Sequence, residues 1–475
     1  MNATVPASAV ATPATALTLR RELGKWDLTA IGINQVIGSA VFILPSQVAA
    51  QVGNWGPIAF LGIGFASLLV ALCFAEVGSR FEGTGGPYLY TRAAFGRFVA
   101  FEVGWMHWFT RVTGQASIVN AIALALGFYW PVMTSGIGRA SMIVAVILAV
   151  GWINLRGIRQ SAFIINLLTI AKLVPLALFI VVGLSFIDVN RLMPLGAVSL
   201  TRFSTGALLL IFAFGGYDVI GVPAGEATNP RRHVPFAFVA TIIAVTAIMT
   251  LVQIVAMGTL PNLPASTTPL ADASLLFIGA TGALLISMGS VASMTGNNVG
   301  GVLTGSRMLF ALAENGELPR FFGKIHGRYQ TPSNAIIFTT VVILGLALSG
   351  SFAVLAVTSA VARLVIYTSA CAATLRLRHP RFQAVVEPAT FVIPAGGLVP
   401  LLAIAVSLFI LGGATRPQLF GGAAALAVGA ALFMANDRFG GGAGWWQRDA
   451  RAHDRVDHMG DEGAVRRMSR ADVSE

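Results

Sequence analysis

The chain has 475 residues, of which 56% are hydrophobic and only 11% are charged, and its mean hydropathy is +0.77. A soluble domain carries about 25% charged residues, so this composition excludes an ordinary water-soluble globular protein. The net charge of +11 would by itself fit nucleic-acid binding, but the basic residues are dispersed between long apolar segments, which argues against a nucleic-acid partner.

Apolar segments of about 20 residues recur along the chain, and each is long enough to cross a hydrocarbon core of roughly 30 Å as a helix. Segments of this length favour helices over the shorter strands of a membrane barrel. We therefore predict an all-α membrane protein with twelve transmembrane helices, at residues 27–50, 57–79, 98–127, 138–155, 161–186, 204–228, 236–258, 273–312, 334–350, 353–376, 393–413 and 417–435.

Basic residues are concentrated in every second loop between these segments, and the intervening loops are short or nearly uncharged. This is the pattern of a multi-pass protein whose basic loops stay in the cytoplasm. It places both termini on the cytoplasmic side of the cell membrane. We expect residues 1–26 to form a cytoplasmic tail and the polar residues 436–475 to form a second, disordered one.

Two of the predicted spans are interrupted by glycine near their middles. The first span contains Gly38-Ser39-Ala40 in the segment GINQVIGSAVFILP, and the sixth contains Gly215-Gly216 in the segment IFAFGGYDVIGVPAGEATNP. Both interruptions fall roughly 17 Å into their spans, close to the middle of a bilayer. Matching breaks in spans one and six predict two inverted five-helix repeats, residues 27–186 and 204–376, followed by two accessory spans at 393–435.

The breaks suggest a binding site for a solute that carries both charges. An unwound helix leaves backbone N–H and C=O groups free, and these are tolerated at membrane depth only where they line a polar cavity. One half-helix offers amides to an anion and the other offers carbonyls to a cation, which suits a zwitterionic amino acid. The alternative is that the glycines serve close helix packing.

Four motifs resemble those of the amino acid–polyamine–organocation transporter family. They are the first-span segment above, FAEVGSRFEGTGGPYLYTRAAFG at 74–96, GEATNPRRHVP at 225–235 and GSRMLFALAENGELPRFF at 305–322. The resemblance covers roughly residues 25–380 and implies the 5+5 inverted-repeat, leucine-transporter-like fold. One departure is Ala40, where the family usually has glycine; alanine does not tolerate positive φ and its methyl group narrows the site.

The resemblance also implies which residues bind the substrate. Its carboxylate is expected at the backbone of the first break, at Ile37, Gly38, Ser39 and Ala40. Its ammonium is expected at carbonyls of the second break, near Phe212, Ala213 and Gly215. Phe212 matches the family's aromatic gate, with lipid contact or packing as the alternative. Gly301 falls where some relatives carry a bulky pocket residue, and close packing is again the alternative.

Lys172 lies near the middle of the fifth span, where a charge costs several kcal/mol. The chain has three lysines among 31 basic residues, so lysine stands out at this depth. Lysine, unlike arginine, can lose its proton when buried, which suggests proton coupling. In the family, a lysine at this place contacts the first break and replaces a sodium ion. The alternative is a snorkelling or structurally paired lysine.

Three further charged residues are candidates for the transport site. Asp218 follows the second break and is suited to relay a proton or to orient the unwound segment. Glu226 is expected to pair with loop arginines at a cytoplasmic gate. Arg111, in the third span, borders the expected site and would disfavour cationic side chains. Arg363 is also placed deep in a span, where arginine usually pairs with carbonyls or carboxylates.

We therefore expect a secondary active transporter that moves amino acids or related amines across the cytoplasmic membrane by proton symport and alternating access. The alternatives are an amino acid/polyamine exchanger on the same fold and a transporter-like receptor. The six histidines occupy loops, span ends or isolated positions, without an HExxH or GxSxG motif. We expect no enzymatic activity, no metal and no cofactor. The expected partners are a small-molecule substrate, protons and the lipid bilayer, and the oligomeric state is not specified.

Overall fold

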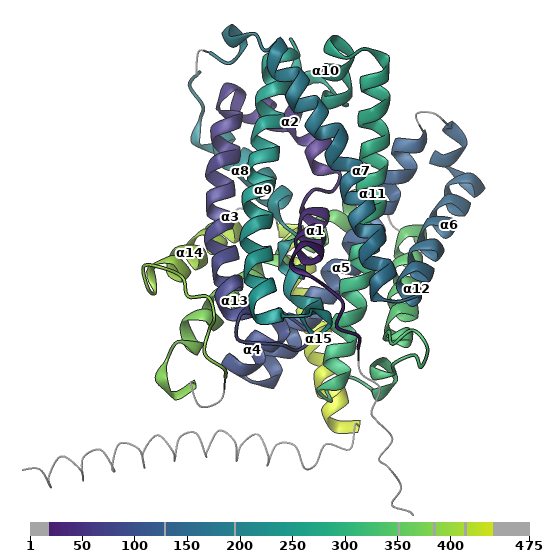
Figure 1. The fold of residues 1–475 in the computed structure, drawn as a ribbon, viewed down its shortest axis with the longest axis vertical. Helices are drawn as coiled ribbons and strands as arrows, with labels where there is room; N and C mark the ends of the chain where they lie inside the picture. Colours follow the sequence, from purple (N-terminus) through teal and green to yellow (C-terminus); the bar gives the residue numbers. More distant parts are fainter. Residues whose placement is uncertain are drawn as a thin grey trace, which may run out of the picture.

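The computed structural model describes residues 19–127, 130–193, 196–349, 352–382, 386–412 and 416–439 (Figure 1). Secondary structure in these residues is helical, apart from one isolated parallel β-bridge between Leu23 and Ala227. The prediction of an all-helical protein is therefore confirmed for the part of the chain that is described.

The helices follow the apolar segments of the sequence. The first part of the chain forms α1 (Lys25–Val36), α2 (Ala40–Val52), α3 (Gly56–Gly78), α4 (Pro87–Phe95), α5 (Arg97–Gly127), α6 (Gly136–Leu155) and α7 (Ile158–Gly183). The second part forms α8 (Leu200–Phe214), the 3₁₀ segment η5 (Tyr217–Glu226), α9 (Pro230–Thr259), α10 (Pro269–Phe277), α11 (Ala280–Glu314), α12 (Ser333–Ser349), α13 (Phe352–Leu377), α14 (Leu398–Gly412) and α15 (Arg416–Phe439).

Two helical features differ from the sequence prediction. The expected span 273–312 is divided into α10 and α11, because the chain turns at Gly279, whose φ of +82° favours glycine. The segment before α5, expected as a loop, contains the short helix α4. By length and composition, five segments of the described chain can cross a membrane: Ala40–Gly78, Gly136–Leu155, Ile158–Phe186, Pro230–Thr259 and Leu419–Arg438. The count of twelve crossings stays a prediction.

The outward faces of the bundle are apolar. Phe65 on α3 and Phe163 on α7 are each more than half exposed, as is Val181 on α7. A soluble protein rarely exposes contiguous apolar surface of this kind, whereas a lipid-facing helix requires it. The buried positions, by contrast, include many polar and charged side chains. This distribution of residues is that of a membrane protein with a polar interior.

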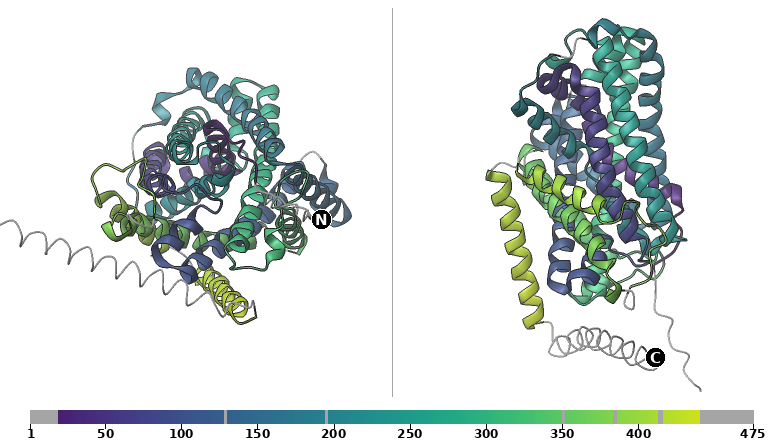
Figure 2. Two further views of the ribbon diagram at one scale, coloured as in Figure 1. Left: turned by 60° about the horizontal axis from the view of Figure 1, so that its bottom comes forward. Right: turned by 90° about the vertical axis from the view of Figure 1, so that its left-hand side faces the viewer.

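Helix α1 lies inside the bundle, where it contacts α7, α9, α11 and η5 (Figure 1). Figure 2 shows the other helices arranged around it and α15 standing along the outside, where it contacts α5 and α13. The first described residues and the end of α15 lie towards the same end of the bundle as α4, and α10 lies at the opposite end (Figure 1).

Both predicted helix breaks are present. Residues 37–39 separate α1 from α2, and Gly215 and Gly216 separate α8 from η5. Gly216 has a φ of +124°, which a residue with a side chain rarely adopts. Neither Ser39 nor Ala40 has positive φ, and Ala40 is the first residue of α2. The backbone at this break therefore accepts alanine without conformational strain.

Candidate functional site

The carbonyl groups freed at the first break are bound by side chains from two other helices. Lys172 of α7 donates from Nζ to the carbonyl oxygens of Asn34 at 3.1 Å and Ile37 at 2.5 Å. Ser293 of α11 donates from Oγ to the carbonyls of Ile37 at 2.8 Å and Gly38 at 2.9 Å. Both donors are fully buried. The unwound segment is thus fixed in place by partners outside α1 and α2.

A group of side-chain amides connects the first break to α5 and α11. Asn297 donates from Nδ2 to the carbonyls of Asn34 and Gln35, each at 3.1 Å. Gln35 donates from Nε2 to the carbonyl of Asn297 at 2.8 Å. Gln115 of α5 donates from Nε2 to Oδ1 of Asn297 at 3.1 Å. Buried amides that are bonded in this way hold three helices in register.

The second break lies directly against the first. A Cβ atom added to Gly216 would lie 2.6 Å from the carbonyl oxygen of Gln35, so only glycine permits this approach. The amide of Gly216 donates to the hydroxyl of Tyr367 at 3.3 Å. Arg363, on α13, lies over Gly215 so closely that a side chain there would collide with its guanidinium. The two breaks therefore form one site.

Asp218 is the centre of a buried charge cluster beside the breaks. Its Oδ2 lies 3.0 Å from Nε2 of His107 and 3.7 Å from Nη2 of Arg111. Its Oδ1 accepts a hydrogen bond from the hydroxyl of Tyr367 at 3.3 Å. Arg111 also donates from Nη1 to Oε1 of Gln35 at 3.3 Å, which joins the cluster to α1. A charged carboxylate is tolerated at this depth because cationic and hydrogen-bonding groups surround it.

A cavity of about 90 Å³ lies between the two breaks. Its size suits a small solute, because pockets for drug-sized ligands occupy about 300–1,000 Å³. The charged residues that line it are Arg111 and Arg363, and no Asp or Glu is among the lining residues. The lining is formed by Gln35, Val36, Gly38, Ser39, Ala40, Thr110, Arg111, Gly114, Gln115, Ser117, Ile118, Ala213, Gly215, Asn297 and Arg363.

Most of the predicted site residues lie at or next to this cavity. It is lined by Gly38, Ser39, Ala40, Ala213, Gly215 and Arg111. Lys172 and Asp218 lie one contact behind it, and Ile37 contributes its carbonyl to Lys172. Gly301 is not on the cavity, because it packs against the side chain of Gln115. Phe212 belongs to α8, but its side chain lies outside the described part of the structure.

Glu226 was predicted to pair with loop arginines, and this prediction is wrong because its partner is Arg307 of α11. Glu226 accepts hydrogen bonds from Nε of Arg307 at 2.8 Å and from Nη2 at 3.0 Å. Arg307 belongs to α11 rather than to a loop, and both side chains are fully buried. Planar, two-point pairing of this kind is the strongest geometry between arginine and a carboxylate. The partner is a buried arginine because the carboxylate itself is buried, and an arginine in an exposed loop would not reach it there.

Further polar contacts involve residues of α4, the start of α5 and the segment after α11. Glu317, at the end of the last motif, lies 3.5 Å from Nε of Arg92 and 3.7 Å from Nε of Arg97. The backbone amides of Glu22 and Leu23 donate to the carbonyl of Glu226 at 2.8 and 2.9 Å. The segment before α1 is thereby joined to the end of η5.

Several residues of the site are not evident from the sequence. His107 stands isolated along the chain, but in the fold it contacts Asp218. The amides Gln35, Gln115 and Asn297 belong to no predicted site, although all three line the cavity. The available signal is a polar side chain inside an apolar segment, which is costly unless it binds something. The sequence does not reveal which of these side chains share one site.

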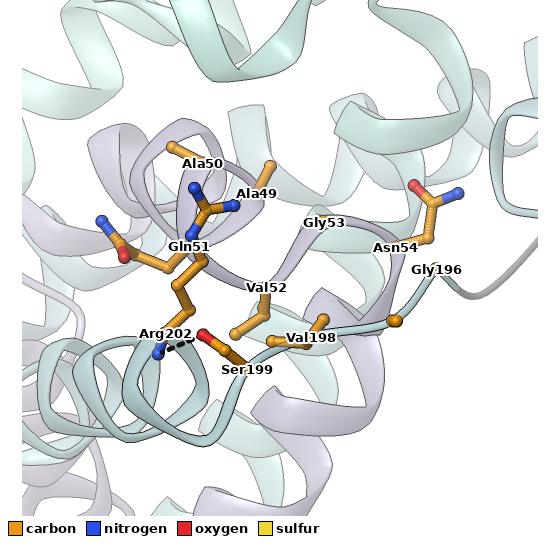
Figure 3. Close-up of a pocket in the computed structure, with 11 residues that line it drawn as sticks. Ala49, Ala50, Gln51, Val52, Gly53, Asn54, Gly196, Val198, Ser199 and Arg202 are labelled. Carbon is orange, nitrogen blue, oxygen red and sulfur yellow. Dashed lines mark hydrogen bonds between the residues drawn. The ribbon is translucent and has the colours of Figure 1, made fainter.

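A second hollow, of about 690 Å³, lies where α2 ends (Figure 3). Arg202 is the charged residue of its lining, and its backbone amide donates to Oγ of Ser199 at 3.4 Å. The predicted site residues are absent from this lining. Since the hollow contains neither helix break, it lacks the paired backbone groups that suit a zwitterion.

The broken helices, the cavity between them and the apolar exterior together define a membrane transporter for a small solute. The sequence profile named "Amino acid permease" matches residues 23–438, and the chain belongs to this family, within the amino acid–polyamine–organocation superfamily.

Curated relatives of similar length are transporters. The serine/threonine exchanger SteT of Bacillus subtilis is 32% identical over 415 residues, which cover 83% of this chain and 91% of the relative. The methylthioribose transporter of the same organism is 27% identical, with 83% and 88% covered. Its branched-chain amino acid permease BcaP is 26% identical, with 83% and 88% covered. The family assignment made from the four motifs is therefore confirmed.

Proposed function

We propose that this protein is a secondary active transporter that moves amino acids across the cytoplasmic membrane by alternating access, driven by proton symport. Membership of the amino acid permease family supports the substrate class. The cavity between the two helix breaks is the site at which the substrate binds. The observation that carries the proposal is the contact between Lys172 and the carbonyls of the first break.

The substrate carboxylate binds at the start of α2. The first amides of a helix have no acceptor within that helix, and they carry a partial positive charge. Ser39, at the N-cap, makes no side-chain capping bond that would compete for these amides. Ser39 and Ala40 also line the cavity, so an anion in the cavity is within reach of this helix end.

The substrate ammonium binds near the end of α8. The last carbonyls of a helix lack intrahelical partners and carry a partial negative charge. Helix α8 ends at Phe214, and the cavity is lined by Ala213 and Gly215 on either side of that end. The two half-helices therefore present opposite partial charges to one small cavity.

Lys172 couples the proton to transport. Its ammonium is fully buried and bonds carbonyls that the break has freed, so protonation favours the geometry in which those carbonyls are held. A neutral amine has fewer donors to share between two carbonyls and releases the segment. Asp218 and His107, which touch each other beside the cavity, serve as a second place where a proton can be held.

The α4 end of the bundle is the cytoplasmic end, and it is closed here. Arg80, Arg92 and Arg97 lie near α4, whereas Asp272 is the charged residue of the α10 segment 260–280 at the opposite end. Basic residues favour the cytoplasmic side. The buried pair between Glu226 and Arg307 acts as the gate on this side, and its separation accompanies the opening inward.

Exchange is the second candidate, because the relative with 32% identity is described as an exchanger. Both mechanisms use the same fold and the same site. They differ in whether net uptake occurs without an internal substrate.

Purified protein in sodium-free proteoliposomes tests the proposal. An inward pH gradient should drive accumulation of a labelled amino acid into empty vesicles, and a proton ionophore should abolish it. Accumulation only in vesicles that were preloaded with amino acid would replace symport by exchange. A requirement for sodium would remove the proton role, and a lack of transport of any amino acid would refute the substrate class.

A further inference from the structure

The cavity between the helix breaks has more positive than negative side-chain charge. Arg111 and Arg363 both line it, and their guanidinium groups remain charged in proteins. Asp218 lies behind them and is the acidic side chain in contact with Arg111 among the described residues. His107, which also contacts Asp218, is either neutral or positively charged and so brings no further negative charge. Among the described residues, two guanidinium groups therefore line the cavity and one carboxylate lies behind it.

Arg111 also has donors that nothing in the described structure uses. Its side chain is 4% exposed. Nη1 donates to Gln35, whereas Nε and Nη2 make no hydrogen bond within the described residues. Nη2 lies 3.7 Å from Asp218, close enough for attraction but too far for a hydrogen bond. The unused hydrogen-bonding capacity belongs to Arg111, and Arg363 contributes its charge.

Such an arrangement indicates a missing anion. A buried arginine is normally matched by acceptors for its donors, and an unmatched one is strongly unfavourable in the interior. A zwitterionic substrate places its one carboxylate at the start of α2 and leaves Nε and Nη2 of Arg111 without an acceptor among the described residues. A substrate with one further carboxylate supplies both the charge and the paired oxygens that a guanidinium binds best.

We propose that the transported solute carries net negative charge and is an amino acid with a carboxylate side chain. The assignment rests on the proposed function, because the helix breaks still bind the α-carboxylate and the ammonium. Arg111 binds the second carboxylate, and Arg363 strengthens the field that attracts it. The cavity then has one partner for each of the three charged groups of the substrate.

The same chemistry separates this substrate class from the polyamines. A polyamine is a long polycation, and two guanidinium groups in a small cavity repel it. A dicarboxylate without an amino group shares the anionic character but leaves the end of α8 unused. That solute is an outcome of the test rather than part of the proposal.

Calorimetric titration of the purified wild-type protein tests the substrate charge directly. The probes are L-glutamate and L-aspartate, their amides L-glutamine and L-asparagine, L-lysine, and the amine-free glutarate and succinate. At least one acidic amino acid should bind about tenfold or more tightly than its amide, which corresponds to about 1.4 kcal/mol. Lysine should not bind measurably.

Three variants locate the effect. Arg111→Gln should weaken binding of the acidic amino acid by about tenfold to a hundredfold. It should change the affinity for the amide by less than about threefold. Arg111→Lys keeps the charge and should retain part of the preference, which covers the case in which Arg111→Gln does not fold. Arg328→Gln, in an exposed loop, is the matched control and should bind like wild type.

The outcomes separate the two proposals. An amide that binds wild type as tightly as its acid would overturn the anionic substrate and leave the amino acid transporter standing. An amine-free dicarboxylate that binds as tightly as the acidic amino acid would show that the ammonium contributes nothing to binding, and would overturn its proposed contact with the end of α8. If none of these five amino acids binds, the titration is extended to the other fifteen, and binding of none of the twenty would overturn the proposed function itself.

Discussion

Two buried charge clusters in this protein are built from similar residues but differ in balance. In the pair between Glu226 and Arg307, one carboxylate meets one guanidinium through two hydrogen bonds. In the cluster around Asp218, one carboxylate faces Arg111 at 3.7 Å, with Arg363 lining the same cavity. The first cluster is balanced and makes its hydrogen bonds internally. In the second, Nε and Nη2 of Arg111 make no hydrogen bond within the described residues.

The difference separates a structural role from a binding role. When a carboxylate and a guanidinium bond each other, they leave no charge for a ligand to neutralise. The two hydrogen bonds between them offset the free-energy cost of burying both charges. An open cluster next to a cavity is stable only if something else completes it. This difference supports the proposal that Glu226 and Arg307 form the gate and that the cluster around Asp218 recognises the substrate.

The largest effect is expected from breaking the balanced pair. Arg307→Ala leaves the carboxylate of Glu226 buried without its partner, which should cost about 3–5 kcal/mol of stability. Arg111→Gln should cost much less, because Arg111 is only partly paired. Thermal unfolding of both purified variants in detergent measures the contrast, with Arg328→Gln as the control. Equal losses for Arg307→Ala and Arg111→Gln would contradict the distinction between the clusters.

Filling either helix break should abolish binding without affecting membrane insertion. A leucine at Gly38 would press on Asn297, whose Nδ2 would lie 3.3 Å from the added Cβ atom, and would occupy the cavity. A leucine at Gly215 would collide with Arg363. Substrate titration of Gly38→Leu and Gly215→Leu measures the loss, and chromatography of the detergent-extracted protein checks the fold. Normal affinity in a correctly folded variant would place the substrate elsewhere.

Lys172 sharpens the comparison, because it is a buried cation that bonds carbonyls rather than a carboxylate. Lys172→Ala should uncouple uptake from the pH gradient, and Lys172→Arg should hold one state because arginine keeps its proton. Both variants should still bind substrate through the backbone. Proteoliposome uptake with and without a pH gradient measures the coupling. Full gradient-driven accumulation by Lys172→Ala would assign the proton to another group, with the Asp218–His107 pair as the next candidate.

The smallest effect is expected from Ala40→Gly. Ala40 begins α2 in ordinary helical geometry, so glycine relieves no strain there and costs at most about 1 kcal/mol in helix stability. Substrate affinity should change by less than about threefold. Titration of the variant with the preferred substrate measures it. A large gain in affinity would show that the methyl group of Ala40 narrows the binding site.

The helix breaks were predictable because glycine and neighbouring small residues interrupt apolar segments in a recognisable way. Lys172 was predictable because lysine is rare in this chain. The partner of Glu226 was not, since the chain offers many arginines and only packing decides which one is buried beside it. His107 of α5 contacts Asp218 of η5, and Arg363 of α13 lines the cavity. No local pattern encodes contacts over such separations.

The charge of the cavity is tested most directly with a thiol placed inside it. Ser39 lines the cavity and is partly exposed, and both native cysteines, Cys73 and Cys371, are buried. In Ser39→Cys, an anionic methanethiosulfonate should react faster than a cationic one of similar size. Relative to the same ratio at Ser135→Cys, an exposed position just before α6 begins, the preference should be about tenfold. A saturating acidic amino acid should slow both reactions. Equal ratios at the two positions, or a preference for the cationic reagent at Ser39→Cys, would contradict a positively charged substrate site.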